Sequence, residues 1–271
     1  NIIDGNQTST VTIAVDDANS DNDFDPVANQ TVTATTTDND VAGFTVTETG
    51  GSTDVNESGT TDTFTIVLNA QPASNVVIAM SSSDTGEATL SGTLSFTNAN
   101  WNTPQTVTVT GVDENTIDGN QTSTITITIV DAISDNDFDD VANQTVTATT
   151  TDNDVAGFTV TQSGGSTAVA ETGTTDTFTI VLNAQPASNV VLTVTSSDTG
   201  EATVNTPLTF TNANWNTPQT VTVTGVDDNL VDGNQTSTVT IAVDDANSDN
   251  DFDPVANQTV TATTTDNDVA G

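Results

Sequence analysis

Three copies of the tripeptide Asp-Asn-Asp stand at residues 38–40, 152–154 and 266–268, each inside the longer string TTTDNDVAG. The chain carries 38 Asp and Glu but no Lys, Arg or His, so its formal net charge is −38. No carboxylate can pair with a cationic side chain, and carboxylates at close range repel one another. Carboxyl groups have ordinary pKa values near ~4, so protonation does not relieve this repulsion at neutral pH. The chemistry that suits such residues is the binding of a metal cation through oxygen ligands.

The missing residue types exclude several other classes of function. Without His, Cys, Lys, Arg or Tyr, most general bases, nucleophiles and oxyanion partners are lacking, and we expect no enzyme. A chain without basic residues lacks the positively charged surface that binds nucleic acid. No apolar run approaches the roughly 20 residues of a membrane helix, so we expect no membrane insertion. The absence of Cys excludes disulfides and thiolate zinc sites.

The chain is a tandem repeat with a period of 114 residues. Residues 44–157 align without gaps to residues 158–271, with roughly four positions in five identical, and residues 1–43 match the last part of both. We therefore expect two full β-sandwich repeats, 44–157 and 158–271, preceded by the C-terminal part of an incomplete repeat at 1–43. The favoured explanation of the partial repeat is that these residues are part of a longer array of repeats. The alternative is an incomplete domain that a neighbouring chain completes.

Within a repeat, apolar residues alternate with Thr at a period of two, which is typical of β-strands. Thr suits the outward positions because it is β-branched yet polar. We expect seven strands in the first full repeat, at about 43–48 (continuing past a bulge to 55), 62–69, 75–82, 93–97, 105–112, 121–130 and 143–151. This pattern predicts an all-β fold of seven-stranded antiparallel Ig-like β-sandwiches, arranged head to tail. Disorder fits poorly with strand-length alternation, and a β-solenoid repeat is far shorter.

The predicted strands position the acids. If successive strands run up and down, the first, third and fifth connections lie at one end of the sandwich, together with the residues that leave the seventh strand. Ca²⁺ takes about 6–8 oxygen ligands, whereas Mg²⁺ prefers a tight octahedron, so we predict Ca²⁺ at this end. The alternative is a solvated end where Asp and Asn serve turns. The predicted metal ligands are Glu57, Asp84, Asp113, Glu114, Asp118, Asp152 and Asp154; Glu171, Asp198, Asp227, Asp228, Asp232, Asp266 and Asp268; and Asp4, Asp38 and Asp40.

A second acidic cluster lies at the opposite end, in the connection between the sixth and seventh strands. The segment SDNDFDD carries Asp135, Asp137, Asp139 and Asp140. Its alternating Asp residues resemble the start of an EF-hand loop, but the glycine and the distal Glu are missing. The segment is either a calcium loop or an ordinary Asx turn.

Several segments resemble one family, the Calx-β module. They are VNESGTTDTFTIVL, SSDTGEATLSGTLSFTNANWNTPQTVTV, GVDENTIDGN and the closing DND. The module occurs in the regulatory domains of sodium–calcium exchangers, in an integrin and in long bacterial surface proteins. The resemblance covers both full repeats and residues 1–43. It implies a β-sandwich that holds calcium through acids in the same four segments, and so through the same predicted ligands.

The expected function is structural. Near-identical repeats suit an array whose task is length, because each repeat contacts mainly its neighbours. An ion beside the short linker DNDVAG would fix the angle between repeats. We expect a calcium-stiffened extracellular array at the cell surface, forming the stalk of an adhesin or the body of a filament. The alternative is a module that binds a glycan or a protein through its loop ends. Self-association into a fibre and sugars on the NQT sequons at Asn6, Asn29, Asn120, Asn143, Asn234 and Asn257 stay open.

Overall fold

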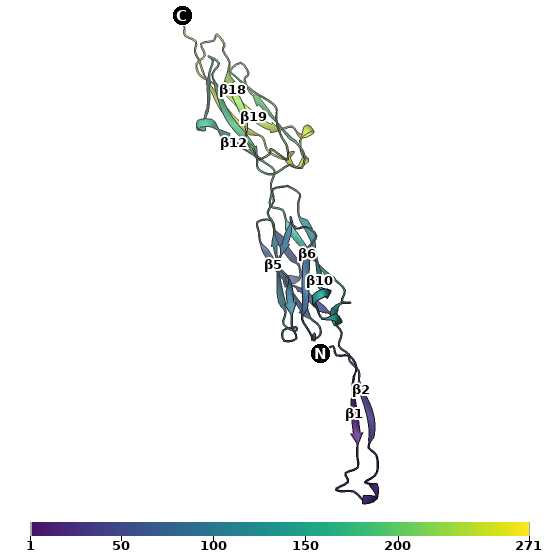
Figure 1. Ribbon diagram of the computed structural model, residues 1–271. Helices are drawn as coiled ribbons and strands as arrows, with labels where there is room; N and C mark the ends of the chain where they lie inside the picture. The colour runs from purple at the N-terminus through teal and green to yellow at the C-terminus, as the bar shows by residue number, and fades with distance from the viewer. Residues whose placement is uncertain (1, 271) are drawn as a thin grey trace. The chain divides into compact units, whose positions relative to one another are not determined.

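The computed structural model describes residues 2–270 and is all-β. Within that range, the helical segments are 3₁₀ turns of three residues each (Figure 1). Each full repeat is built from two sheets, which confirms the predicted β-sandwich class. None of the described helices has the length and apolar character needed to cross a membrane.

The repeat 44–157 contains nine strands in two sheets. One sheet has the order β3-β5-β9-β7 and the other β4-β11-β10-β6-β8. The strands are β3 (Phe44–Glu48), β4 (Thr53–Asn56), β5 (Thr61–Leu68), β6 (Val76–Ser82), β7 (Ala88–Leu90), β8 (Leu94–Phe96), β9 (Gln105–Gly111), β10 (Gln121–Ile129) and β11 (Gln144–Thr151).

The repeat 158–271 has the same topology. Its sheets have the orders β12-β14-β18-β16 and β13-β20-β19-β15-β17. The strands are β12 (Phe158–Gln162), β13 (Thr167–Ala170), β14 (Thr175–Leu182), β15 (Val190–Ser196), β16 (Ala202–Val204), β17 (Leu208–Phe210), β18 (Gln219–Gly225), β19 (Gln235–Val243) and β20 (Gln258–Thr265).

One expected strand is divided between the sheets, and one observed strand was not expected. The first breaks at Gly50 and Gly51, whose φ angles of 78° and 91° suit only glycine. After this break β4 joins the other sheet and runs parallel to β11. The fourth expected strand, at 93–97, is β8, which pairs with β6, whereas β7, which pairs with β9 in the other sheet, lies outside the expected strands. The strand order therefore differs from a simple up-and-down meander.

The alternating apolar residues form one core in each repeat. Phe64, Ile66 and Leu68 are buried, as their alternation with polar residues predicts. Trp101 and Trp215 are half-buried against the cores of their repeats. The Thr residues between the apolar positions are mostly exposed or half-buried.

Residues 7–36 hold a separate two-stranded antiparallel sheet. It consists of β1 (Gln7–Ile13) and β2 (Gln30–Thr36), with Val11 opposite Val32. By sequence they correspond to the first parts of β10 and β11.

The chain divides into two compact units whose limits differ from the repeat limits. One comprises Asn1–Asp113 and Asn120–Thr151, and the other comprises Glu114–Gly119 and Asp152–Gly271. The loop at 114–119 and the linker at 152–157 therefore belong to the same unit as the repeat 158–271. Within that unit the N–H of Gln185 donates to the carbonyl of Asn115 at 2.6 Å, and Ile117 packs against the core.

Candidate metal centre

Five carboxylates meet at one end of the repeat 158–271. Glu171 follows β13 directly, Glu201 precedes β16, Asp232 lies between β18 and β19, and Asp266 and Asp268 follow β20. Oxygen atoms of Glu171, Asp266 and Asp268 lie within 4.8 Å of one another. Oxygen atoms of Glu171, Glu201 and Asp232 also lie within 4.8 Å of one another, so Glu171 joins the two groups.

Glu171 is held in place by the parallel pairing of β13 with β20. Ala170 lies opposite Thr265, and the N–H of Glu171 donates to the carbonyl of Thr265 at 3.2 Å. The backbone of β18 approaches closely at Gly225, where a Cβ atom would lie 2.2 Å from the carbonyl oxygen of Ala170. The side chain of Glu171 is 1% exposed. A carboxylate is thus fixed inside the end of the sandwich.

The Asp-Asn-Asp segment at 266–268 is a turn ordered by its own first carboxylate. Asp266 accepts from the N–H of Asp268 at 2.6 Å and from the N–H of Gly233 at 2.7 Å. These hydrogen bonds lower the pKa of Asp266, the bond from Asp268 most. The N–H of Asn267 donates to Glu171 at 3.0 Å. The middle residue therefore ties the turn to the buried glutamate.

Two other carboxyl groups of the centre are electrostatically unfavourable when charged. Burial raises the pKa of Glu201 and of Asp268, and neighbouring carboxylates raise both further. Glu201 is 7% exposed. Its Oε2 atom and the Oδ2 atom of Asp268 are buried and have no hydrogen-bond partner. Buried oxygens without a hydrogen-bond partner are rare in native structures, and a bound ion is one cause of them.

Each of the two groups of three carboxylates fits a calcium ion. Ligand oxygens at ~2.3–2.6 Å from one ion lie at most about 5 Å apart, and both groups meet this limit at 4.8 Å. All donors are oxygens, as a hard cation requires. An ion in one group would give the buried oxygen of Asp268 a partner, an ion in the other would do so for Glu201, and either would offset the mutual repulsion. These residues can hold a cation.

Three predicted ligands of this repeat have other hydrogen bonds and lie outside the two groups. Asp198 accepts from the N–H of Gly200 at 2.9 Å and orders the β15–β16 loop. Asp227 accepts from the side-chain amide of Asn267 at 3.0 Å, and Asp228 accepts from the N–H of Leu230 at 2.7 Å. Asp227 and Asp228 still contribute to the raised pKa of Asp268, so they lie near the centre.

Sequence reasoning missed Glu201. The prediction took the Asp of the segment SSDTGEAT as the ligand and passed over the Glu three residues later. The signal was present, because Asp before x-Gly is typical of an Asx turn, which occupies the Asp carboxylate. The next acidic residue, at the start of a strand, then faces the interior.

The corresponding residues of the repeat 44–157 are divided between the two compact units, so each is described by itself. Glu57 is 1% exposed after β4, and Asp84 accepts from the N–H of Gly86. Asp113 follows β9, Glu114 accepts from the N–H of Thr116, and Asp118 lies before β10. Asp152 accepts from the N–H groups of Gly119 and Asp154. The counterpart of Glu201 is Glu87, which is also buried.

In residues 1–43 the same turn forms without the buried glutamates. Asp38 accepts from the N–H groups of Asp40, Gly5 and Asp4 at 2.9, 2.8 and 3.0 Å, and these bonds, the one from Asp40 most, lower its pKa. Among the described residues, Asp4, Asp38 and Asp40 join no group of three potential metal ligands.

The opposite end of each sandwich contains Asx turns. Asp135 caps a 3₁₀ turn by accepting from the N–H of Asp137 at 3.1 Å, and it accepts from the N–H of Ser74 at 2.6 Å. Although burial raises the pKa of Asp135, these donors lower it overall. Asp249 makes the equivalent bonds to Asp251 and Ser188. The structure thus favours the Asx turn over the calcium loop.

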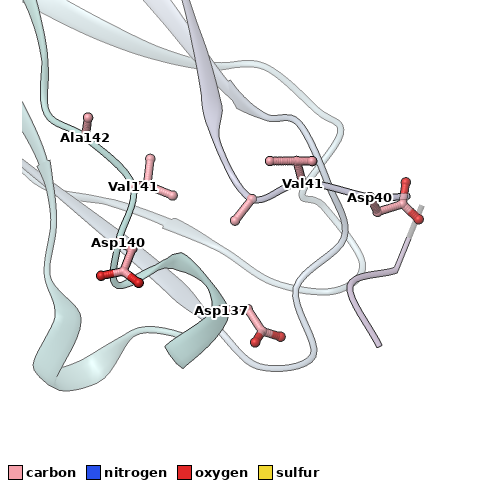
Figure 2. A pocket seen from close by; sticks show the side chains of 7 residues that line it. Asp40, Val41, Asp137, Asp140, Val141 and Ala142 are labelled. Carbon is pink, nitrogen blue, oxygen red and sulfur yellow. The ribbon is translucent and has the colours of Figure 1, made fainter. Parts of the chain in front are cut away.

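A shallow pocket of about 450 Å³ lies beside this turn. Figure 2 shows Asp40 and Val41 of the linker on one side and Asp140, Val141 and Ala142 on the other, with Asp137 between them. The three acids of this lining form no group of potential ligands among the described residues.

No protein family and no curated protein matches the chain. Among solved structures, CBD12 from CALX1.2 is similar, with 13% identity, a TM-score of 0.31, and coverage of 73% of this chain and 79% of that one. Domains 4 and 5 of the S-layer protein SbsC are similar at 15% identity and a TM-score of 0.34, covering 84% of this chain and 100% of theirs. These likenesses are distant, and the fold assignment rests on the strand pairing of this chain.

Proposed function

We propose that this chain is a calcium-stabilised structural array of an extracellular protein, serving as the stalk of a surface adhesin or the body of a surface filament. The observation that carries the proposal is the two clusters of three carboxylates that share Glu171, in a chain with no Lys, Arg or His. Buried charges normally require a partner. Here only a bound cation or protonation can supply neutralisation.

The link between cation binding and stiffness rests on the loop at 114–119. Asn115 and Ile117 of this loop contact the repeat 158–271. Glu114 and Asp118, two predicted ligands, flank these residues in the sequence. An ion that orders the ends of the loop would order the segment that contacts the next repeat. The proposal includes no catalytic role, since the chain lacks His, Cys, Lys, Arg and Tyr.

Thermal unfolding of the full chain tests the proposal. Calcium at 100 times its dissociation constant contributes about 2.7 kcal/mol per site, which corresponds to a rise of about 10 °C for a repeat of this size. We expect the melting temperature to be higher by this amount in calcium than in excess EDTA, and to be raised much less by magnesium. Glu171→Gln should reduce the calcium stoichiometry measured by calorimetric titration.

The matched control is Asp253→Asn, which removes one exposed charge from a 3₁₀ turn outside the centre. The control should retain the wild-type stoichiometry. An unchanged melting temperature of the wild-type chain in calcium would refute the proposal. Binding of a glycan or a protein through the loop ends would then be the next function to test.

A further inference from the structure

The six NQT sequons fall into two groups, each repeated three times along the chain. The sequence N-x-Thr is the acceptor of N-linked sugar in secreted proteins when it lies on the surface. Asn6, Asn120 and Asn234 directly precede β1, β10 and β19, whereas Asn29, Asn143 and Asn257 directly precede β2, β11 and β20. The surroundings of the Asn side chain differ between the two groups.

The side chains of the first group are hydrogen-bonded beside the Asp-Asn-Asp turn. The carboxamide oxygen of Asn234 accepts from the N–H of Asp266 at 3.3 Å, and that of Asn6 accepts from the N–H of Asp38 at 2.9 Å. The chain has one further N-x-Ser sequence, at Asn56, whose carboxamide oxygen accepts from the hydroxyl two residues later. Each of these carboxamides therefore already has a structural role.

The sequon of the second group presents its acceptor residues outward. Gln258, the middle residue, is half-buried, and its side-chain amide donates to the carbonyl of Phe158 at 2.6 Å. Successive side chains of an extended chain point to opposite faces, so the residues on either side of this glutamine share the other face. Asn257 and Thr259 are accordingly both exposed.

The repeat 44–157 has the same arrangement. The side-chain amide of Gln144 donates to the carbonyl of Phe44 at 2.7 Å, and Asn143 and Thr145 are both exposed. Across residues 2–270, no hydrogen bond holds the carboxamide of Asn143 or that of Asn257. These two carboxamides are therefore available to a modifying enzyme.

The strand that follows Asn257 also leaves room for an enzyme. β13 pairs with β20 only from Ala262 to Thr265, so the strand edge beside Thr259 is uncovered within the described part of the chain. The Asp-Asn-Asp turn lies beyond the other end of β20, about 24 Å away along an extended strand of this length. A sugar on Asn257 therefore lies well away from the candidate metal centre of its repeat.

We propose that the second group of sequons accepts N-linked oligosaccharide, at Asn143 and Asn257 and, by sequence, at Asn29. The first group and Asn56 stay unmodified. The donor is an oligosaccharide linked to a lipid diphosphate, which an oligosaccharyltransferase presents to the carboxamide. This inference rests on the extracellular location in the proposed function and is independent of calcium.

The transfer is a substitution at the anomeric carbon of the donor. The Nδ2 atom of the Asn forms a bond to this carbon, and the bond from the carbon to the diphosphate oxygen breaks. The lipid diphosphate leaves with the electron pair, and the proton lost from Nδ2 passes to a base of the transferase. Nothing is oxidised or reduced.

Peptide mass mapping of the chain isolated from the cells that make it tests the inference. Trypsin has no cleavage site in this chain, but a protease that cleaves after Asp and Glu places the two groups of sequons on different peptides. We expect an added oligosaccharide mass on the peptides that carry Asn143 and Asn257, and none on those that carry Asn120 and Asn234. Unmodified Asn143 and Asn257, or sugar on the first group, would overturn the inference.

Transfer in vitro shows whether the fold selects the sites. With a purified oligosaccharyltransferase and a lipid-linked oligosaccharide, the folded chain should be modified at least about fivefold faster at the second group, since a carboxamide of the first group must first lose a hydrogen bond. Unstructured synthetic peptides of residues 233–244 and 252–266 should be modified at similar rates. The same difference between these peptides would overturn the inference, because the sequence alone would then select the sites.

Two substitutions of an exposed residue provide matched controls. Thr259→Ala removes the acceptor sequence and should abolish the added mass at Asn257 while leaving it at Asn143. Thr259→Ser retains the acceptor sequence and should retain the added mass. Calcium-dependent melting measured on the same samples separates the two proposals. A chain that carries the sugars without responding to calcium would contradict only the proposed function, and a calcium-stabilised chain without sugars would contradict only this inference.

Discussion

Replacing Glu201 with Gln should change stability in opposite directions with and without calcium. The substitution keeps the length of the side chain and removes one negative charge from the centre. Glu201 is 7% exposed, its Oε2 atom has no hydrogen-bond partner, and burial followed by neighbouring carboxylates raises its pKa. The charged form is therefore unfavourable until a cation binds beside it.

The size of the effect follows from the distances in the centre. Two unit charges 4.8 Å apart repel by about 3 kcal/mol at an effective dielectric constant of 20. Asp232 is exposed, so water screens much of this repulsion, and we expect a gain of about 1 kcal/mol in EDTA. In calcium, an affinity weakened a hundredfold reduces a contribution of about 2.7 kcal/mol to about 0.4. The variant should then be about 1 kcal/mol less stable than the wild type.

The assay is thermal unfolding followed by tryptophan fluorescence in a Trp101→Phe background. Trp215 then reports on the repeat 158–271, against whose core it packs. Glu201→Gln should raise the melting temperature by about 4 °C in EDTA and lower it by about 4 °C in calcium. Asp253→Asn, which removes an exposed charge, should change neither by more than about 2 °C.

A shift of the same sign in both conditions would contradict this reasoning. Destabilisation in EDTA would mean that the Glu201 carboxylate is neutralised or hydrogen-bonded without an ion. Stabilisation that persists in calcium would mean that Glu201 is no ligand. Either result would leave the acids as a solvated cluster.

Two further predictions concern proton binding and backbone packing. In EDTA, stability should rise as pH falls from neutral towards the ordinary carboxyl pKa near ~4, because the raised pKa values of Glu201 and Asp268 let the folded state bind protons before the unfolded chain does. Below about pH 4 stability should fall, because the lowered pKa values of Asp135 and Asp266 favour proton uptake by the unfolded chain. Melting temperatures measured across this pH range should therefore pass through a maximum. A melting temperature that falls steadily below pH 7 would contradict the prediction. Gly225→Ala should cost about 3 kcal/mol and weaken calcium binding, because the new Cβ would lie 2.2 Å from the carbonyl of Ala170, next to Glu171. Chemical denaturation and calcium titration check both effects, with Gly92→Ala, where no atom lies near the new Cβ, as the control.

The fold class was accessible from the sequence because alternation at a period of two is a local property. Phe64, Ile66 and Leu68 face one side of a strand in any sheet that contains them, and all three are buried. The division of the first strand was not accessible in this way. Gly50 and Gly51 mark a break, but only the pairing of β4 with β11 decides which sheet the strand joins next.

Part of the candidate centre was also predicted from the sequence, because the predicted strands place these acids in loops at one end of the sandwich. Glu171, Asp232, Asp266 and Asp268 were expected to converge from the order of the strands, and the structure brings them together in two groups. The sequence could not separate these ligands from Asp198, because both kinds of residue are acids in loops at the same end. The hydrogen bond from Gly200 to Asp198 occupies one carboxylate oxygen locally and leaves Glu201 to face the interior.

The sequence by itself determined the repeat period, the β-sandwich class and the absence of any side-chain partner for a carboxylate, since these depend on residue identity and spacing alone. The tertiary structure decided which carboxylates are buried together and which identical segments form a core. Val239 is buried and Val11 is half exposed in the same local sequence, because burial depends on the strands that pack beside a residue. Those strands come from distant parts of the chain, and local sequence does not specify them.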